Sequence, residues 1–109
     1  MINFDDFLKV EIKIGEIKEV EILEKSDKLI VEKVDFGEEE LRTVVSGIKN
    51  YFDDPKELEG LKCAFVTNLE PRSIMGIESQ AMIMAASTDD GTFSPLVVSP
   101  DIPVGTKIG

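Results

Sequence analysis

One apolar stretch near the N-terminus constrains the fold more than any other feature of the chain. From Val10 to Ile14 apolar side chains recur at every second residue, which is the pattern of a half-buried β-strand. After Gly15 the apolar positions lose this phase over residues 17–22. A phase slip beside a glycine indicates a bulge or a bend within a strand. A long, bent first strand is what a small closed barrel requires, so the sequence favours a barrel.

Four more strands and one short helix are predicted after this bent strand. The strands cover residues 29–36, 41–46, 62–69 and 80–87, and the acidic run 38–40 is expected to be a solvated hairpin tip. A helix is predicted over Asn50–Leu58, since Asp54 is a suitable N-cap and Pro55 fits the first helical position. The expected fold is therefore all-β, a five-stranded oligonucleotide/oligosaccharide-binding (OB) fold barrel with one short helix between strands 3 and 4.

The length and apolar content indicate one domain. The chain has 109 residues, of which 42% are hydrophobic, enough for one small core. We expect the barrel over about 8–88 and a C-terminal extension over about 89–109. Seven apolar residues between Phe93 and Gly109 must cover either this barrel or a second copy of the chain. No stretch approaches the roughly 20 apolar residues of a membrane helix, and the single Cys63 favours a reducing cytoplasm.

The residue inventory argues against catalysis. The chain has no histidine and only one cysteine. It therefore lacks the commonest general base and cannot build a structural zinc site. No nucleophile–base pair or phosphate-binding glycine loop can be assembled from the remaining residues. We expect a binding module that uses no cofactor and no metal.

The distribution of charge limits how such a module could bind a polyanion. The net charge is −10, yet the window 62–88 is neutral, with two acids and two bases. Non-specific binding to nucleic acids depends on cationic contacts with phosphates, which this chain is poor in. If the protein binds RNA, it should use shape and hydrogen bonding over a limited patch.

Several short blocks of the chain have a characteristic amino-acid sequence and follow one another in a characteristic order. Asn68–Ser87 is NLEPRSIMGIESQAMIMAAS and joins two apolar strands through a polar loop. Three blocks precede it, DFLKVEIKIG over Asp6–Gly15, SDKL over Ser26–Leu29 and TVVSGI over Thr43–Ile48, and PVGTKI over Pro103–Ile108 follows. Together they resemble the tRNA-binding domain that is appended to, or associated with, methionyl-tRNA synthetases. The resemblance covers the chain from about Phe4 to its last residue.

That resemblance implies both a function and partners. It implies a non-catalytic tRNA-binding module, acting in trans as a methionyl-tRNA synthetase β subunit or as a stand-alone structure-specific tRNA-binding protein. It also implies a homodimer formed through the C-terminal extension, and a methionyl-tRNA synthetase catalytic subunit as a possible partner. A similar branch of the family is a secretion-related chaperone, so binding of unfolded polypeptide is the alternative function.

The candidate tRNA-binding residues come mostly from the loop between the last two barrel strands. Arg72 could pair with a phosphate or stack on a base, or instead form an ion pair with Glu70 or Glu78. The loop methionines could contact a splayed base, although methionine more often fills a core. On the strand 2–3 side, where OB folds bind ligands, Lys13 and Lys33 are further candidates. The main candidates are Lys28, Arg42, Ser46, Asn68, Arg72, Met75, Gly76, Ser79 and Met82.

Four of these candidates also have plain structural explanations. Arg42 could pair with the acidic run Glu38–Glu40. Asn68 could cap a turn before Pro71, as asparagine often does. Ser46 and Ser79 could bond the nearby backbone, as serine hydroxyls commonly do in turns. The sequence leaves these alternatives open.

Overall fold

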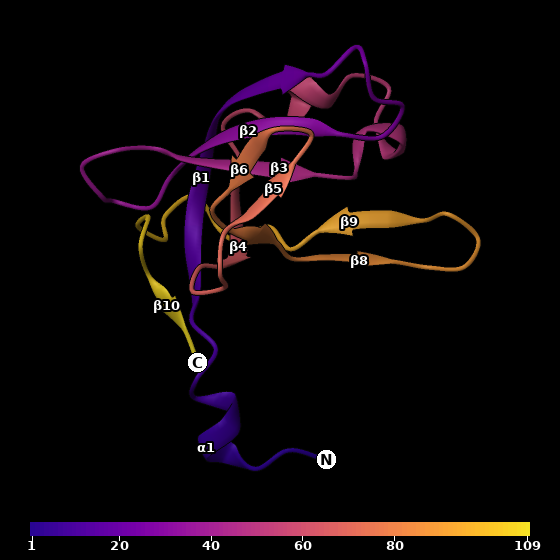
Figure 1. Ribbon diagram of the computed structural model, residues 1–109. Coiled ribbons are helices and arrows are strands. Elements are labelled where there is room, and N and C mark those ends of the chain that lie inside the picture. Colours follow the sequence, from indigo (N-terminus) through magenta and orange to yellow (C-terminus); the bar gives the residue numbers. More distant parts are fainter.

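The computed structural model describes residues 1–109 and contains a nearly closed barrel of five strands with very little helix (Figure 1). The strand order of its main sheet is β3-β2-β1-β4-β7, and β10 also pairs with β1. The elements, in chain order, are α1 Phe4–Phe7, β1 Ile12–Ile22, β2 Ile30–Asp35, β3 Arg42–Ser46, η1 Lys49–Tyr51, η2 Pro55–Leu58, β4 Lys62–Val66, β5 Arg72–Ile74, β6 Ile77–Ser79, β7 Met82–Ile83, β8 Ala85–Ser87, β9 Phe93–Pro95 and β10 Lys107–Ile108.

Strand β1 is long and bent, as the slip in its apolar pattern predicted. Its register with β2 shifts between Ile17 and Glu19, so a bulge lies in the predicted segment. Gly15 lies where β1 packs closely on β2, because a Cβ added there would be 2.5 Å from Val34 Cγ1 and 2.6 Å from Phe36 Cε1. The bend lets one strand pair with β2 over its second half and with β4 over its first.

The barrel closes where the edge of β3 meets the segment just before β7. The Gln80 amide donates to the Thr43 carbonyl at 2.8 Å, and the Gln80 side chain accepts from the Thr43 amide at 2.8 Å. The Val45 amide donates to Ser79 Oγ at 2.9 Å. Side chains therefore replace part of the missing strand ladder, and they fix the loop region 79–81 to the barrel wall.

Two apolar clusters hold the fold together, and both involve β1 and β4. The main cluster fills the barrel, with Phe36 and Phe65 in edge-to-face contact at 5.2 Å between ring centroids. The smaller cluster lies on the other face of β1 and β4, where alternate side chains point outward. Its members are Ile12, Ile14, Ala64 and Val66, with Met84, Val98 and Ile102 packed against them.

The prediction of one short helix over Asn50–Leu58 is wrong in the type of helix. The segment contains two 3-10 turns, η1 and η2, instead of one α-helix. The local signals were read correctly at η2, since the Asp54 side chain accepts from the Lys56 amide and Pro55 lies at its start. Only five residues separate the cap Asp54 from Gly60, which has φ +91°, so the turn ends before an α-helix can develop.

The strand predicted over 80–87 is interrupted, and the loop before it is more regular than expected. Only Met82–Ile83 pairs with β4, while Ala85–Ser87 leaves the barrel to pair with Phe93–Pro95 as a separate hairpin. Conversely, residues 72–79 form a hairpin, β5–β6, which the sequence analysis treated as an open loop.

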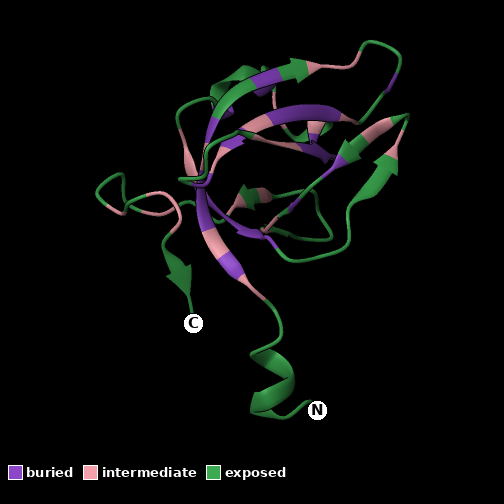
Figure 2. Ribbon diagram, turned by 60° about the vertical axis from the view of Figure 1, so that its left-hand side comes forward, coloured by how far each residue is buried: buried purple, intermediate pink, exposed green.

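The C-terminal extension covers part of its own barrel. Val98 and Ile102 pack on the smaller cluster, Phe93 packs on the main one, and β10 pairs with the start of β1. Dimerisation through this extension stays a prediction. At the other end of the chain, α1 extends away from the barrel on the same side as the C-terminus, and all its residues are exposed (Figure 2). None of the helices is long and apolar enough to cross a membrane.

Candidate functional site

The β5–β6 hairpin lies against β3 and turns at Met75-Gly76. Both turn residues have positive φ, 51° for Met75 and 78° for Gly76, as a tight two-residue hairpin loop requires. Glycine adopts this conformation freely, whereas a side chain such as that of methionine is strained there. The strained turn leaves the Met75 side chain 56% exposed at the tip of the hairpin.

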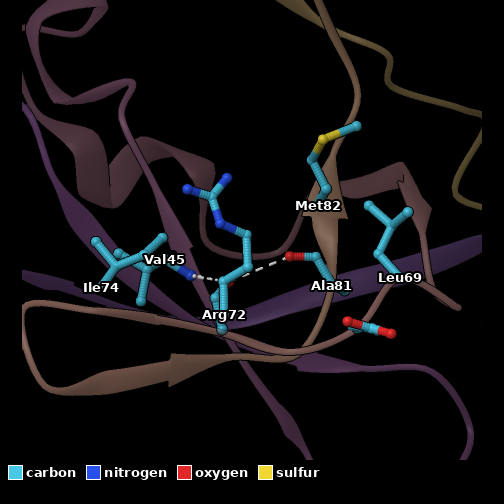
Figure 3. Close-up of a pocket in the computed structure, with 8 residues that line it drawn as sticks. Val45, Leu69, Arg72, Ile74, Ala81 and Met82 are labelled. Carbon is cyan, nitrogen blue, oxygen red and sulfur yellow. Dashed lines mark hydrogen bonds between the residues drawn. The ribbon is translucent and has the colours of Figure 1, made fainter.

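A pocket of about 120 Å³ lies between this hairpin and the barrel wall. Figure 3 shows Val45 and Ile74 on one side of it, Leu69 and Met82 on the other, and Arg72 between them. Two of these apolar walls are largely exposed, Leu69 at 51% and Met82 at 49%. The pocket is therefore an open, mostly apolar hollow with polar groups at its edge. The remaining lining residues are Glu70, Ser79 and Ala81.

Arg72 and Glu70 supply the two charges at this pocket, and both are exposed. Neither side chain forms an ion pair or a hydrogen bond with the rest of the chain; the ion pairs that do form involve other residues. The ion pair of Arg72 with Glu70 or Glu78, which the sequence left open, does not form. The guanidinium and the carboxylate are therefore both available to an outside molecule.

Arg42 has a different environment and joins three parts of the chain. Its Nε and Nη2 donate to the two Glu38 carboxylate oxygens at 2.9 and 2.8 Å. Its Nη1 donates to the Thr67 carbonyl at 2.7 Å and to the Gln80 carbonyl at 3.2 Å. The guanidinium lies 5.3 Å from the centre of the Phe36 ring. Hydrogen bonding from Arg42 lowers the pKa of Glu38, and that carboxylate raises the pKa of Arg42.

Asn68 fastens the start of the loop to the segment before β1. Its Nδ2 donates to the Lys9 carbonyl at 2.7 Å, and its Oδ1 accepts from the Glu11 amide at 2.8 Å. The Thr67 hydroxyl donates to Glu11 Oε1 at 2.7 Å, which lowers the pKa of Glu11. The Asn68 side chain thus bonds to the backbone that leads into β1, the strand next to β4, and it does not cap a turn.

Both serines are buried, Ser79 in the pocket wall and Ser46 on the inner face of β3 beside Val44. Ser79 accepts from Val45 and donates to the Ala81 carbonyl at 3.2 Å, so its hydroxyl is bonded to the backbone within the barrel wall. Ser46 is 6% exposed, and its hydroxyl has no hydrogen-bond partner. Both hydroxyls are screened from solvent, and only that of Ser79 belongs to the pocket wall.

The candidate lysines are spread around the barrel. Lys28 is exposed in the β1–β2 loop. Lys13 forms an ion pair with Glu11 at 3.5 Å, and Lys33 Nζ donates to Thr43 Oγ1 at 2.6 Å. Of the sequence candidates, the structure brings Arg72, Ser79 and Met82 together at the pocket.

A second, broader hollow of about 500 Å³ lies at the tip of the hairpin. It is bounded by the end of β1 and the start of the β1–β2 loop, residues 21–25, and by Met75 and Ile77 of the hairpin. The β1–β2 loop and the segment before the last barrel strand are the regions with which OB folds bind oligonucleotides. The hairpin therefore contributes residues to both hollows on the expected ligand side.

Sequence reasoning missed several residues of this site. The hairpin had a signal, because Met75-Gly76 stands between Ile74 and Ile77 in the pattern of a two-residue turn. Val45 also had a sequence signal. Adjacent residues of a strand face opposite sides, so the pair Val44-Val45 predicts one inward and one outward apolar side chain, and both are buried here. Leu69 and Glu70 had no local signal, because only the packing of the hairpin makes them pocket residues.

No cluster of three or more His, Cys, Asp or Glu side chains is arranged to hold a metal ion.

Two titratable groups with raised pKa values are buried away from the pocket. Glu32 is fully buried inside the barrel, and desolvation raises its pKa to about 7. The same cause raises the pKa of Cys63 to about 11.

Comparison with known families places most of the chain within one of them. The family described as "Putative tRNA binding domain" matches residues 12–107. A methionine–tRNA ligase of Caldanaerobacter subterraneus subsp. tengcongensis is 49% identical over 107 residues, which are 98% of this chain and 16% of that enzyme. The chain thus spans about a sixth of the length of the curated relatives it matches.

Solved structures show the same fold over the whole chain. A MetRS-related protein from Pyrococcus horikoshii is 40% identical, with a TM-score of 0.92, and the match covers 100% of this chain and 98% of that one. The chaperone CsaA from Bacillus anthracis strain Ames is 28% identical, with a TM-score of 0.86 and coverage of 100% and 99%. The structural likeness thus extends both to a MetRS-related protein and to a chaperone.

Proposed function

The chain belongs to the tRNA-binding domain family, and on that premise we propose that it is a non-catalytic module that binds folded tRNA in the cytoplasm. It would act in trans, as a methionyl-tRNA synthetase β subunit or as a stand-alone structure-specific tRNA-binding protein. Such a module raises the local concentration of tRNA near a partner enzyme, so modest affinity at a single site is sufficient.

One observation carries this proposal: the guanidinium of Arg72 is unpaired and lies at the edge of an open apolar pocket. RNA that exposes unstacked bases is recognised by stacking on apolar groups or guanidinium planes together with hydrogen bonds. The pocket offers both kinds of contact in the electrically neutral window of an acidic chain. Met75, Gly76, Met82 and Lys28 are the further candidates for direct contact.

The remaining candidates have supporting roles in this proposal. Arg42, Asn68 and Ser79 join the loop to β3, to the segment before β1 and to the barrel wall. Ser46 lies on the inner face of β3. These four residues would act by fixing the shape of the site rather than by contact with RNA.

The experiment is a titration of labelled tRNA with wild type, Arg72→Ala and Arg72→Lys, followed by fluorescence anisotropy at two salt concentrations. Loss of a charge-assisted contact should weaken binding roughly tenfold in Arg72→Ala. Arg72→Lys should recover only part, because lysine keeps the charge and loses the planar group. Lys107→Ala is the control, since it removes an exposed cation from β10. Equal tRNA affinity for Arg72→Ala and Lys107→Ala would refute the assignment.

We propose that the protein is a homodimer that uses the C-terminal extension. Exposed apolar side chains remain on this extension and on α1, including Leu96, Val97, Ile108, Phe4 and Leu8. Burial of such a surface is the usual reason for association. Light scattering should give twice the monomer mass at micromolar concentration, and a monomer there would reject the dimer. Co-purification with a methionyl-tRNA synthetase would test the proposed enzyme partner.

Polypeptide binding is the second candidate function, favoured by the likeness to CsaA. The exposed Leu69, Met75 and Met82 could contact apolar peptide segments as flexible side chains do. Suppression of the aggregation of an unrelated unfolded protein, with no binding to tRNA, would support this function over the first.

A further inference from the structure

The pocket beside the β5–β6 hairpin is lined by one acidic and one basic side chain, and the presence of both restricts which ligands can bind. Glu70 and Arg72 are separated in sequence by Pro71 alone, and both line the pocket. Despite this closeness their side chains do not pair. A carboxylate at a site for a polyanion is electrostatically unfavourable unless it receives hydrogen bonds from the ligand.

The dimensions of the pocket suit a single flat group. Its volume of about 120 Å³ is well below the roughly 300–1,000 Å³ typical of sites for drug-sized ligands. Its walls are the aliphatic and thioether side chains of Val45, Leu69, Ile74 and Met82, with no aromatic ring. A base that leaves the RNA stack could place one face on these walls, while the guanidinium of Arg72 lies over the other face or on the adjoining phosphate.

We propose that this pocket binds an unstacked guanine of the RNA, and that Glu70 is the residue that selects it. The inference rests on the proposed function and names the base that the site recognises. Guanine presents N1–H and N2–H side by side on its Watson–Crick edge, so one carboxylate can accept from both at once. This is the two-bond geometry with which carboxylates bind the fork of a guanidinium.

The other bases match this arrangement less well. Uracil offers one N–H between two carbonyl groups, which would repel a carboxylate. Cytosine and adenine each present one amino group beside an acceptor nitrogen, so they can give Glu70 one hydrogen bond only. Among amino acid side chains only arginine has a matching pair of donors, and its charge would be opposed by Arg72. An apolar peptide side chain could pack against the pocket walls but would give Glu70 no hydrogen bond.

The test measures binding of four nucleotides, GMP, IMP, AMP and UMP, to the full chain by NMR, with the amide signals of Ser79, Ala81 and Met82 as reporters. IMP is GMP without the 2-amino group. Wild type should bind GMP several-fold to tenfold more tightly than IMP, and UMP most weakly. In Glu70→Gln the ratio of GMP to IMP affinity should fall to near one, since the amide cannot accept two hydrogen bonds as the carboxylate does.

The matched control is Glu78→Gln on β6, which removes the same charge from the neighbouring hairpin strand. It should leave the ratio of GMP to IMP affinity unchanged. The inference is overturned if Glu70→Gln changes the affinity for GMP and IMP equally, because Glu70 then acts only as a negative charge. It is also overturned if an apolar peptide displaces GMP and binds more tightly, or if wild type does not discriminate between GMP and IMP.

The outcome is separable from that of the proposed function. Binding of tRNA that depends on Arg72, without any preference for GMP over IMP, would leave the function standing and reject the guanine pocket. Discrimination between the nucleotides without measurable binding of tRNA would reject the function and keep the pocket.

Discussion

Stability should fall as the pH rises through neutrality, because of a single carboxylate inside the barrel. Glu32 lies on the inner face of β2, opposite Val44 of β3, and is 0% exposed. Neither of its carboxylate oxygens has a hydrogen-bond partner. The hydroxyl of Ser46 on β3 lowers the pKa of Glu32 by less than burial raises it. Burial without a partner disfavours the ionised form.

The size and sign of the effect follow from the shift in its pKa. The pKa is 4.5 when the chain is unfolded and about 7 when it is folded. Glu32 contributes stability that is complete below pH 4.5 and is lost as the pH rises through about 7. A difference of about 2.5 pKa units corresponds to about 3 kcal/mol at high pH. Most of this loss should occur between about pH 5 and about pH 8.

Urea unfolding followed by far-ultraviolet circular dichroism measures the effect directly. Wild type should lose about 2–3 kcal/mol of unfolding free energy over this range, whereas Glu32→Gln should show little change. Glu39→Gln, at the exposed tip of the β2–β3 hairpin, should behave as wild type does. Three other carboxylates have lowered pKa values, so the stability that they contribute is lost only as the pH falls below this range. They are Glu11, Glu38 and Asp90. Parallel profiles for wild type and Glu32→Gln would refute the reasoning.

Three other substitutions test the framework that holds the site. Arg42→Met should lower the unfolding free energy by about 1–3 kcal/mol, because it leaves Glu38 and two carbonyls without their donor; urea unfolding checks this. Met75→Asn should raise stability by up to about 1 kcal/mol, since asparagine tolerates positive φ better; an unchanged or lower melting temperature would contradict it. Gly15→Ala should cost about 1–3 kcal/mol, because its Cβ would lie 2.5 Å from Val34 Cγ1; a variant as stable as wild type would show that β1 and β2 can separate freely.

Much of the barrel could be predicted because its signals are local. The phase slip after Gly15 located the bulge in β1, and the strands around residues 30–35 and 42–46 followed from apolar runs that end at turn residues. The break between Ile83 and Ala85 could not be located in this way. Residues 81–86 form one continuous apolar run, and only pairing with β9 decides that Ala85 leaves the barrel.

The polar residues of the site were harder to assign, since their roles depend on partners far away in sequence. Asn68 bonds to Lys9 and Glu11, which lie 59 and 57 positions earlier. Glu32 had no sign of burial other than its place between Ile30 and Val34 on one strand face. The alternation of Glu32 with apolar neighbours predicts that its side chain points into the barrel. Its charge predicts the opposite, that it points to solvent. Sequence alone cannot show which of these two signals prevails.

Hydrogen exchange with and without tRNA tests the central claim most directly, because it locates the contact surface without altering any residue. We expect tRNA to slow exchange in residues 69–82, which form the pocket and its hairpin, and to leave α1 and the C-terminal extension unchanged. Slower exchange confined to α1 or to residues 93–109, with none in 69–82, would contradict the account.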